Sequence, residues 1–388
     1  MFHFFFFKTT SYSIQCESEL KHADPVPKHK LIALTLVTRH GMRTTMEEWL
    51  DPEKAGFWQC QSEHSYSPRI TSLKGNGFRR RFLNSLNDDS LSFQPSCHGG
   101  ELTLGGMRQH AALGKFYRNY LVKELKFLPN RLDKELIGLR SSKIDRCIKS
   151  QQSFMSEFYP PANPGEEMEI ITGTPYHEPL YPDYGQCTYL SEQWAKFIKE
   201  PEFAKRREQA ERIYGSIFDK LNITKDGINW MFIGDWLYSY YCNDQDLPDY
   251  VTDEMVDQAL LDVAWYSYGF FDYTPGANGA SIWRVALRDF DALLGEKTKK
   301  KFWMYSAHDS TIAAVLNSFG ISGKYLPPYR SHLAIELWQK GDNEPYLRLV
   351  LNGDAVKIPA KDSELIKYSE AKELLKPSVE KFCVEELP

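Results

Sequence analysis

The chain has 388 residues, of which 42% are hydrophobic and 26% are charged, a composition typical of globular proteins. Because 52 Asp and Glu residues outnumber 47 Lys and Arg residues, the formal net charge is -5 and no basic excess exists to bind nucleic acid. No stretch approaches the roughly 18 consecutive apolar residues of a membrane-spanning helix. The length predicts either two or three domains or one core with a large insertion.

Residues 1–28 are expected to form a leader or tail. The apolar run Phe4–Phe7 suits the end of a secretory signal, although it is shorter than usual; the alternative is a disordered tail. If Cys16 is removed with this leader, six cysteines remain, an even number that suits up to three disulfides in a secreted or lysosomal protein. The alternative is that several are buried apolar side chains. No CxxC or His/Cys cluster is present, so no metal site is predicted.

The first predicted element is a strand over Leu31–Val37, a nearly continuous apolar run typical of a strand buried on both faces of a mostly parallel sheet. It ends at Thr38-Arg39-His40-Gly41, and such strand ends lie at the edge where α/β proteins bind ligands. Residues 46–100 lack periodicity and are rich in Pro, Gly, Ser and Asn, which predicts an irregular insertion.

Two helices and a short strand follow. Apolar residues recur at spacings of three and four over Leu104–Leu121, with Thr103 as a candidate N-cap. A short strand is predicted over Leu136–Leu139, and it leads into a second amphipathic helix that ends before Pro160.

The remaining chain is predicted to form a mostly helical segment, followed by a segment that contains further strands of the sheet. Residues 165–295 show aromatic-rich, mostly helical patterns and are expected to form a helical cap. Phe302–Tyr305 predicts a second buried strand, followed by Ser306-Ala307-His308-Asp309 and a helix that stops at Gly320. Alternating residues over 333–338 and 346–351 predict an antiparallel hairpin. We expect a three-layer α/β/α core with a mostly parallel central sheet, formed by 29–164 and 296–388, plus the smaller cap.

The two buried strands would bring Arg39, His40 and Arg43 together with His308 and Asp309 at one sheet edge. A neutral imidazole is a nucleophile at mildly acidic pH, and guanidinium groups match the charge and geometry of phosphoryl oxygens. A carboxyl beside a phosphate dianion has a raised pKa, so Asp309 would be protonated and able to donate a proton at acid pH. Taken singly, each residue has a structural alternative, such as an N-cap or a buried core histidine.

Five segments together resemble the histidine acid phosphatase family, branch 2 of the histidine phosphatase superfamily. The motifs are VTRHGMR, LTLGGMRQHAALGKFYRNYL, RSSKIDRCIKSQQSF, YSAHDSTIAAVL and PPYRSHLAIELW. The chain departs from the family pattern in lacking the usual proline after Arg43, in having Met42 within RHGxR, and in the longer 46–100 interval.

The resemblance implies a metal-independent, cofactor-free acid phosphatase acting on a small phosphomonoester, as a monomer or homodimer. It implies that His40 is phosphorylated and that Asp309 is the general acid, with the phosphate bound by Arg39, Arg43, Arg146 and His308. Arg140 is the weaker candidate for phosphate binding. A disulfide between Cys187 and Cys383 is also implied. The pairing of the other cysteines stays open, namely that of Cys60, Cys97, Cys147 and Cys242.

Two alternative functions use the same residues. One is a phosphotransferase or phosphomutase with the same covalent intermediate, and the other is an inactive protein that binds phosphorylated ligands. Single-domain mutases share RHG but take their acid from a glutamate elsewhere, so the His-Asp pair favours the phosphatase. Generic monoesters, phosphosugars, phosphoinositols and lysophosphatidate all remain open as substrates.

Overall fold

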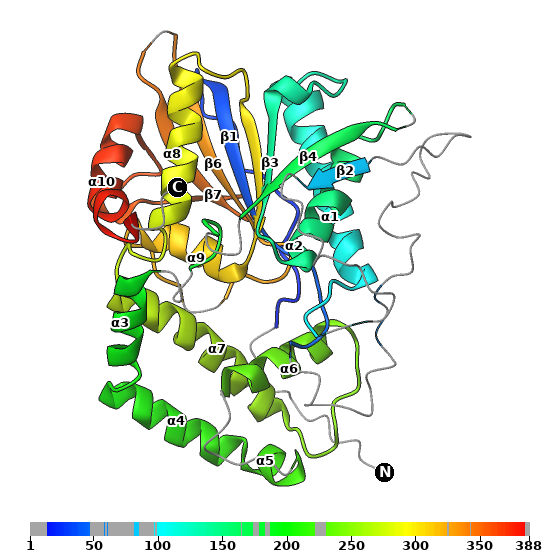
Figure 1. Cartoon of the computed structure of the whole chain (residues 1–388), viewed down its shortest axis with the longest axis vertical. Coiled ribbons are helices and arrows are strands. Elements are labelled where there is room, and N and C mark those ends of the chain that lie inside the picture. Colours follow the sequence, from blue (N-terminus) through cyan, green and yellow to red (C-terminus); the bar gives the residue numbers. More distant parts are fainter. Residues whose placement is uncertain are drawn as a thin grey trace, which may run out of the picture.

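The computed structural model describes residues 14–46, 58, 60, 81–84, 97, 99–163, 165–173, 178–182, 187–221, 230–323, 326–341 and 343–384. The apolar run near the N-terminus and most of the predicted 46–100 insertion lie outside these residues. Figure 1 shows two parts, a sheet flanked by helices and, beside it, a group of helices.

The central sheet positions the ends of the two predicted strands side by side. In the described part of the chain its strand order is β2-β4-β3-β5-β1-β6-β7-β8, with β9 also paired to β7. The strands from β2 to β1 are parallel, whereas β6, β7, β8 and β9 are antiparallel to their neighbours. Their bounds are β1 Lys30–Arg39, β2 Arg81–Asn84, β3 Ile137–Ser141, β4 Glu167–Thr172, β5 Phe302–Ala307, β6 His332–Gln339, β7 Tyr346–Leu351, β8 Asp354–Val356 and β9 Leu365–Lys367.

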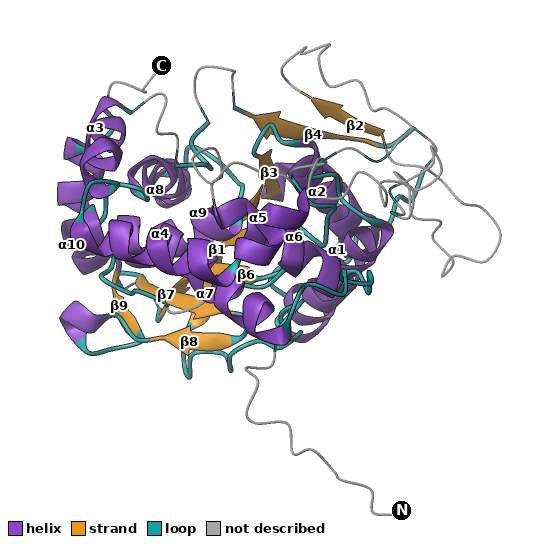
Figure 2. Ribbon diagram, turned by 90° about the horizontal axis from the view of Figure 1, so that it is seen from below, coloured by secondary structure: helices purple, strands orange, loops and turns teal. Residues whose placement is uncertain are grey.

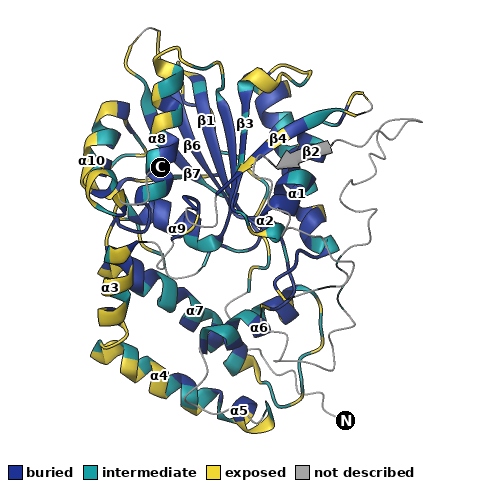
Figure 3. Ribbon diagram, in the orientation of Figure 1, coloured by how far each residue is buried: buried dark blue, intermediate teal, exposed yellow. Residues whose placement is uncertain are grey.

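Helices cover both faces of this sheet, which confirms the predicted three-layer α/β fold (Figure 2). One face packs against α1 (Leu104–Tyr117) and α2 (Asp145–Phe158), and a π-helical segment over Arg118–Glu124 continues α1. The other face packs against α8 (Ala280–Leu294), α9 (Asp309–Asn317) and α10 (Tyr368–Lys381). The central strands are accordingly buried on both sides (Figure 3), which is why their sequences are continuously apolar.

The helical part consists of α3 (Thr188–Phe197), α4 (Pro201–Ile213), α5 (Gly215–Leu221), α6 (Trp230–Cys242) and α7 (Asp253–Tyr273). Its own core is aromatic: Trp236 and Tyr240 of α6 pack with Val256 and Ala259 of α7. The structure differs from the predicted division in two places, because β4 and α8 lie within 165–295 but belong to the α/β core. Helical periodicity indicates that α8 has an apolar face but not which neighbour covers that face.

Two disulfides tie distant segments together. Cys187 and Cys383 are bonded, as the resemblance implied, and this bond joins the start of α3 to the chain after α10. Cys242, whose pairing the sequence left open, is bonded to Cys16 of the 1–28 segment. Residues just after Cys16 also contact the core, since the backbone N–H of Ser18 donates to the carbonyl of Tyr329. Cys60, Cys97 and Cys147 are free thiols.

A disulfide partner 226 residues away leaves no local signal in the sequence. Within the residues that the structure describes, no helix is both long enough and apolar enough to cross a membrane.

Candidate active site

The parallel pairing of β1 and β5 brings two histidines to one edge of the sheet. Arg39, the last residue of β1, is in register with Ala307, the last residue of β5. The next residue of each strand is therefore a histidine, and the ring centroids of His40 and His308 lie 5.7 Å apart. The predicted meeting of these segments is present in the structure.

The loop after β1 is held closely against two helices. A Cβ atom on Gly41 would lie 2.3 Å from the carbonyl oxygen of Gly106 in the first turn of α1, so only glycine fits there. The backbone N–H of Gly41 donates to the Ser150 hydroxyl of α2 at 3.1 Å, and that of Met42 donates to the Gln109 side chain at 2.9 Å. These contacts fix the orientation of His40 and Arg43.

His40 is oriented as a nucleophile. Its Nδ1 atom lies 2.9 Å from the Gly41 carbonyl oxygen, which can only accept a hydrogen bond, so Nδ1 carries the proton and Nε2 keeps its lone pair. The pKa of His40 is lowered well below its usual value, chiefly by burial and then by the positive charges of Arg146, Arg39 and Arg43. The imidazole is therefore neutral in mildly acidic solution.

Three arginines surround His40, and two of them are paired with carboxylates. Arg39 contacts Asp309 at 2.8 Å and lies over the ring of Tyr329, with 4.3 Å from Cζ to the ring centroid. Arg43 binds Asp235 of α6 through both terminal nitrogens. Arg146, from the first turn of α2, has a lowered pKa because of burial and the nearby charge of Arg43. A bound anion would offset this concentration of positive charge.

His308 and Asp309 form the start of α9. The Nε2 atom of His308 lies 3.0 Å from the Ser142 hydroxyl, and burial followed by the charges of Arg146, Arg43 and Arg39 lowers its pKa. Asp309 accepts the backbone N–H of Ser310 at 2.7 Å while its other oxygen pairs with Arg39. The Asp309 side chain is 22% exposed, so it reaches the cavity.

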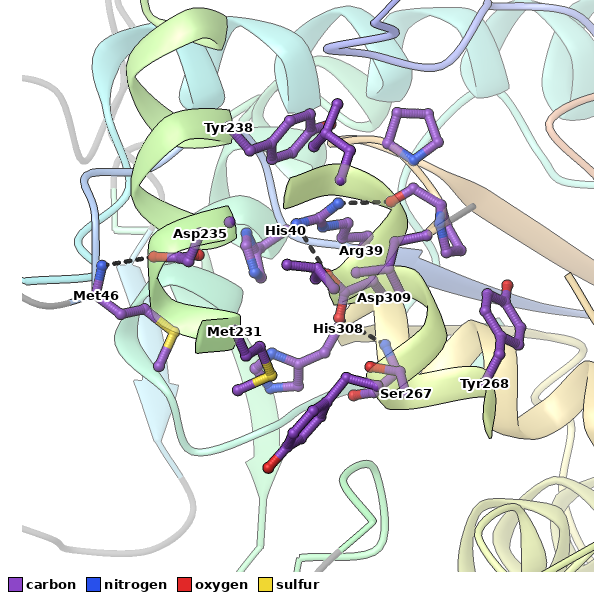
Figure 4. A pocket seen from close by; sticks show the side chains of 18 of the residues that line it. Arg39, His40, Met46, Met231, Asp235, Tyr238, Ser267, Tyr268, His308 and Asp309 are labelled. Atoms are coloured by element: carbon purple, nitrogen blue, oxygen red, sulfur yellow. Dashed lines mark hydrogen bonds and ion pairs between the residues drawn. The ribbon is translucent and has the colours of Figure 1, made fainter. Parts of the chain in front are cut away.

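All six predicted site residues line one cavity of about 640 Å³; they are Arg39, His40, Arg43, Arg146, His308 and Asp309. Figure 4 shows four of them, Arg39, His40, His308 and Asp309, around this cavity. Arg140 instead lines a separate cavity with Asp289 and Tyr305. In the aromatic segment of α6, Trp236 and Tyr240 belong to the helical core, whereas Tyr238 lines the site cavity.

Sequence reasoning missed Asp235, Ser142 and Tyr329. Ser142 and Tyr329 lie within the quoted motifs RSSKIDRCIKSQQSF and PPYRSHLAIELW, but these motifs assign them no role. Asp235 contacts Arg43 across 192 residues of chain. The available signal was weak: Met231, Asp235 and Tyr238 are spaced four and three apart, which places them on one face of a helix. This spacing gives no indication of the residue that they meet.

A sheet edge with a neutral imidazole and three guanidiniums defines an α/β protein with an anion-binding site. A family model described as histidine phosphatase superfamily (branch 2) matches residues 30–200 and 250–352. The chain therefore belongs to this superfamily, which confirms the resemblance found in the motifs.

Several known proteins are similar over most of the chain. Counting factor 60 of Dictyostelium discoideum is 25% identical over 350 residues, covering 86% of this chain and 83% of that protein. Prostatic acid phosphatase of Rattus norvegicus is 25% identical over 341 residues, covering 81% and 77%. These relatives place the chain among the histidine acid phosphatases. The structure of Hafnia alvei phytase in complex with myo-inositol hexakis sulphate has a TM-score of 0.63 at 14% identity, covering 94% of this chain and all of that one, which shows a shared fold.

Proposed function

We propose that this protein hydrolyses phosphomonoesters through a phosphohistidine at Nε2 of His40, with Asp309 as the general acid. The observation that carries the proposal is the orientation of His40: its Nδ1 is held by the Gly41 carbonyl at 2.9 Å, so Nδ1 carries the proton and Nε2 keeps its lone pair. The lowered pKa of His40 keeps this nitrogen unprotonated at acid pH.

In the first step Nε2 of His40 attacks phosphorus, the ester P–O bond breaks, and Asp309 transfers its proton to the departing alkoxide. In the second step Asp309 accepts a proton from water, which attacks phosphorus and breaks the P–N bond, so that inorganic phosphate leaves and His40 is regenerated. Arg39, Arg43 and Arg146 neutralise the phosphoryl oxygens, and His308 donates a hydrogen bond to one of them. The positive charge that the reaction needs is supplied by these side chains, without a metal.

The test is hydrolysis of p-nitrophenyl phosphate near pH 5 in the presence of a chelator. His40→Ala should abolish phosphate release, whereas His29→Ala, which changes the histidine just before the start of β1, should not. Full activity of His40→Ala would overturn the proposal. Absence of turnover in the wild-type protein, with phosphate still bound, would instead identify an inactive phosphate-binding protein.

The role of Asp309 is tested by varying the leaving group. Asp309→Asn should lose about 10²-fold or more in kcat with alkyl phosphates, whose alkoxides need a proton, and less with p-nitrophenyl phosphate. Equal losses on both substrates would contradict the assignment. Adding a simple alcohol as acceptor separates hydrolysis from transfer, because a transferase would place most of the phosphate on the alcohol.

We also propose that the protein matures in the secretory pathway, either for secretion or for the lysosome. Disulfides persist in oxidising compartments, and the structure contains two that join segments about 200 residues apart. Alkylation of the unreduced protein from its natural source should leave Cys16, Cys187, Cys242 and Cys383 unmodified. Modification of these four cysteines would point to a reducing compartment.

A further inference from the structure

The wall of the cavity that faces the catalytic residues is formed by two helices of the cap. Helix α6 contributes Met231 and Phe232, and α7 contributes Leu260 and Leu261; Leu326, from the chain before β6, adds a further apolar side chain. Figure 4 shows Met231, Asp235 and Tyr238 of α6 around the same space as His40, His308 and Asp309. The phosphate end of the cavity is therefore charged, and much of the opposite wall is apolar.

The cavity is much larger than a phosphate group. Its volume is about 640 Å³, whereas a phosphate takes up the space of a few water molecules, on the order of 100 Å³. Most of the volume is therefore available to the alcohol part of an ester. Apolar surface gains free energy when it leaves water for such a wall, so the cavity favours an apolar alcohol.

The charged groups of the cavity are suited to one phosphate rather than several. Arg39 and Arg43 already pair with Asp309 and Asp235, and together with Arg146 they surround the position that His40 can attack. Asp257 of α7 also lines the cavity, one helical turn before Leu260 and Leu261. A substrate with further phosphates would place negative charge against the carboxylates of Asp235 and Asp257, which is unfavourable.

We propose that the cavity selects phosphate monoesters of a large apolar alcohol, such as a long alkyl chain, over multiply phosphorylated polyols. This inference rests on the proposed phosphatase function and specifies its substrate class. It separates the chain from the phytase whose fold it shares, since that protein is in complex with a hexakis sulphate of inositol.

The experiment compares kcat/KM for ethyl, butyl and octyl phosphate, kept below their micelle concentrations, with that for myo-inositol hexakisphosphate. Octyl phosphate has six more methylenes than ethyl phosphate, and burial of each contributes about fourfold in binding. If only half of them reach the apolar wall, kcat/KM should rise by about 50-fold from ethyl to octyl. The hexakisphosphate should be hydrolysed more slowly than ethyl phosphate.

Two variants and a control connect this preference to the wall. Leu260→Asn should reduce the ratio of octyl to ethyl activity by about 10-fold, because the buried chain loses an apolar contact. Asp257→Asn should raise the activity on the hexakisphosphate relative to ethyl phosphate. Leu294→Asn makes the same apolar-to-amide change at an exposed position at the end of α8 and should alter neither ratio.

The outcomes separate this inference from the proposed function. Hydrolysis of all alkyl phosphates at similar rates, or a preference for the hexakisphosphate, would overturn the inference and leave the phosphatase function standing. If no ester is hydrolysed and p-nitrophenyl phosphate is also untouched, both are overturned.

Discussion

Burial and nearby positive charge both act on the pKa of His40, the proposed nucleophile. Burial lowers its pKa most, and Arg146 is the largest of the charged contributors. Replacing this charge with an amide in Arg146→Gln should raise the pKa of His40, so the imidazole becomes protonated at a higher pH. The acid limb of the kcat/KM profile should therefore move to higher pH, while kcat/KM at the optimum falls by about 10²-fold because a phosphate contact is lost.

The matched control for this variant is Arg108→Gln, which removes an arginine from the exposed face of α1. Its pH profile of kcat/KM should overlay that of the wild-type protein. An acid limb that stays in place in Arg146→Gln, despite the loss of activity, would mean that burial alone sets the protonation of His40.

Asp235 occupies the terminal nitrogens of Arg43, which the proposed mechanism needs for the phosphate. Its carboxylate binds both terminal nitrogens of Arg43 and also accepts the backbone N–H of Met46 at 2.9 Å. In Asp235→Asn the amide oxygen can still accept from Arg43, but the negative charge beside the anion is gone. Inhibition by inorganic phosphate should therefore strengthen by about threefold to tenfold in Ki, a change of about 1 kcal/mol. A weaker Ki would show that orientation of Arg43 matters more than charge.

Helices α1 and α2 cross at a position that tolerates no side chain. A Cβ atom on Gly114 of α1 would lie 2.1 Å from the carbonyl oxygen of Phe154 in α2. Gly114→Ala must force the helices apart and should reduce the free energy of unfolding by about 1–3 kcal/mol, measured by urea denaturation. Because α2 also carries Arg146 and Ser150, activity should fall as well.

Gly215→Ala provides the control for this substitution. Gly215 begins α5 and has no atom within 4 Å of the position that a Cβ would occupy. The same chemical change there should leave stability unchanged or raise it by up to about 1 kcal/mol, because alanine favours a helix. A loss of stability in both variants would indicate that the crossing is not the cause.

The sequence predicts well those elements whose buried residues form a regular pattern, either a continuous apolar run or a helical spacing. β1 and β5 are buried on both faces and read as apolar runs, and the N-cap of α1 is Thr103 as expected, since its side chain accepts from the N–H of Gly106. β8 and β9 have three residues each, which is too short for any periodicity to appear. Their positions depend on pairing with β7, a contact between distant segments.

At the scale of the whole molecule, the sequence predicts those site residues that lie in recognisable motifs. Local patterns placed His40 and His308 at strand ends, and the family resemblance added Arg146, which nothing in its own helix marks as a site residue. The contact of Asp235 with Arg43 and the bond of Cys16 to Cys242 depend on how the cap sits on the core. Such contacts arise from packing between distant parts of the chain, and no local sequence pattern indicates them.

Buried histidines impose a pH dependence on the stability of the whole fold. His110 of α1 is fully buried, donates its Nε2 hydrogen bond to the Arg39 carbonyl at 3.0 Å, and has its pKa lowered to about 3, mainly by burial. In the unfolded chain the histidine pKa is about 6.5. Between these values the unfolded state binds a proton that the folded state does not, so the stability present above pH 6.5 declines as the pH falls toward 3.

His110→Gln removes this proton uptake and keeps a side-chain donor. Between pH 6 and pH 4 the slope of unfolding free energy against pH should be less positive than in the wild-type protein by up to about 1.4 kcal/mol per unit. Comparing the two proteins cancels the contributions of the other titrating groups that the substitution leaves unchanged. Gly215→Ala, which adds no titratable group, should shift stability equally at every pH. Parallel curves for His110→Gln and the wild-type protein would show that His110 takes up its proton in the folded state.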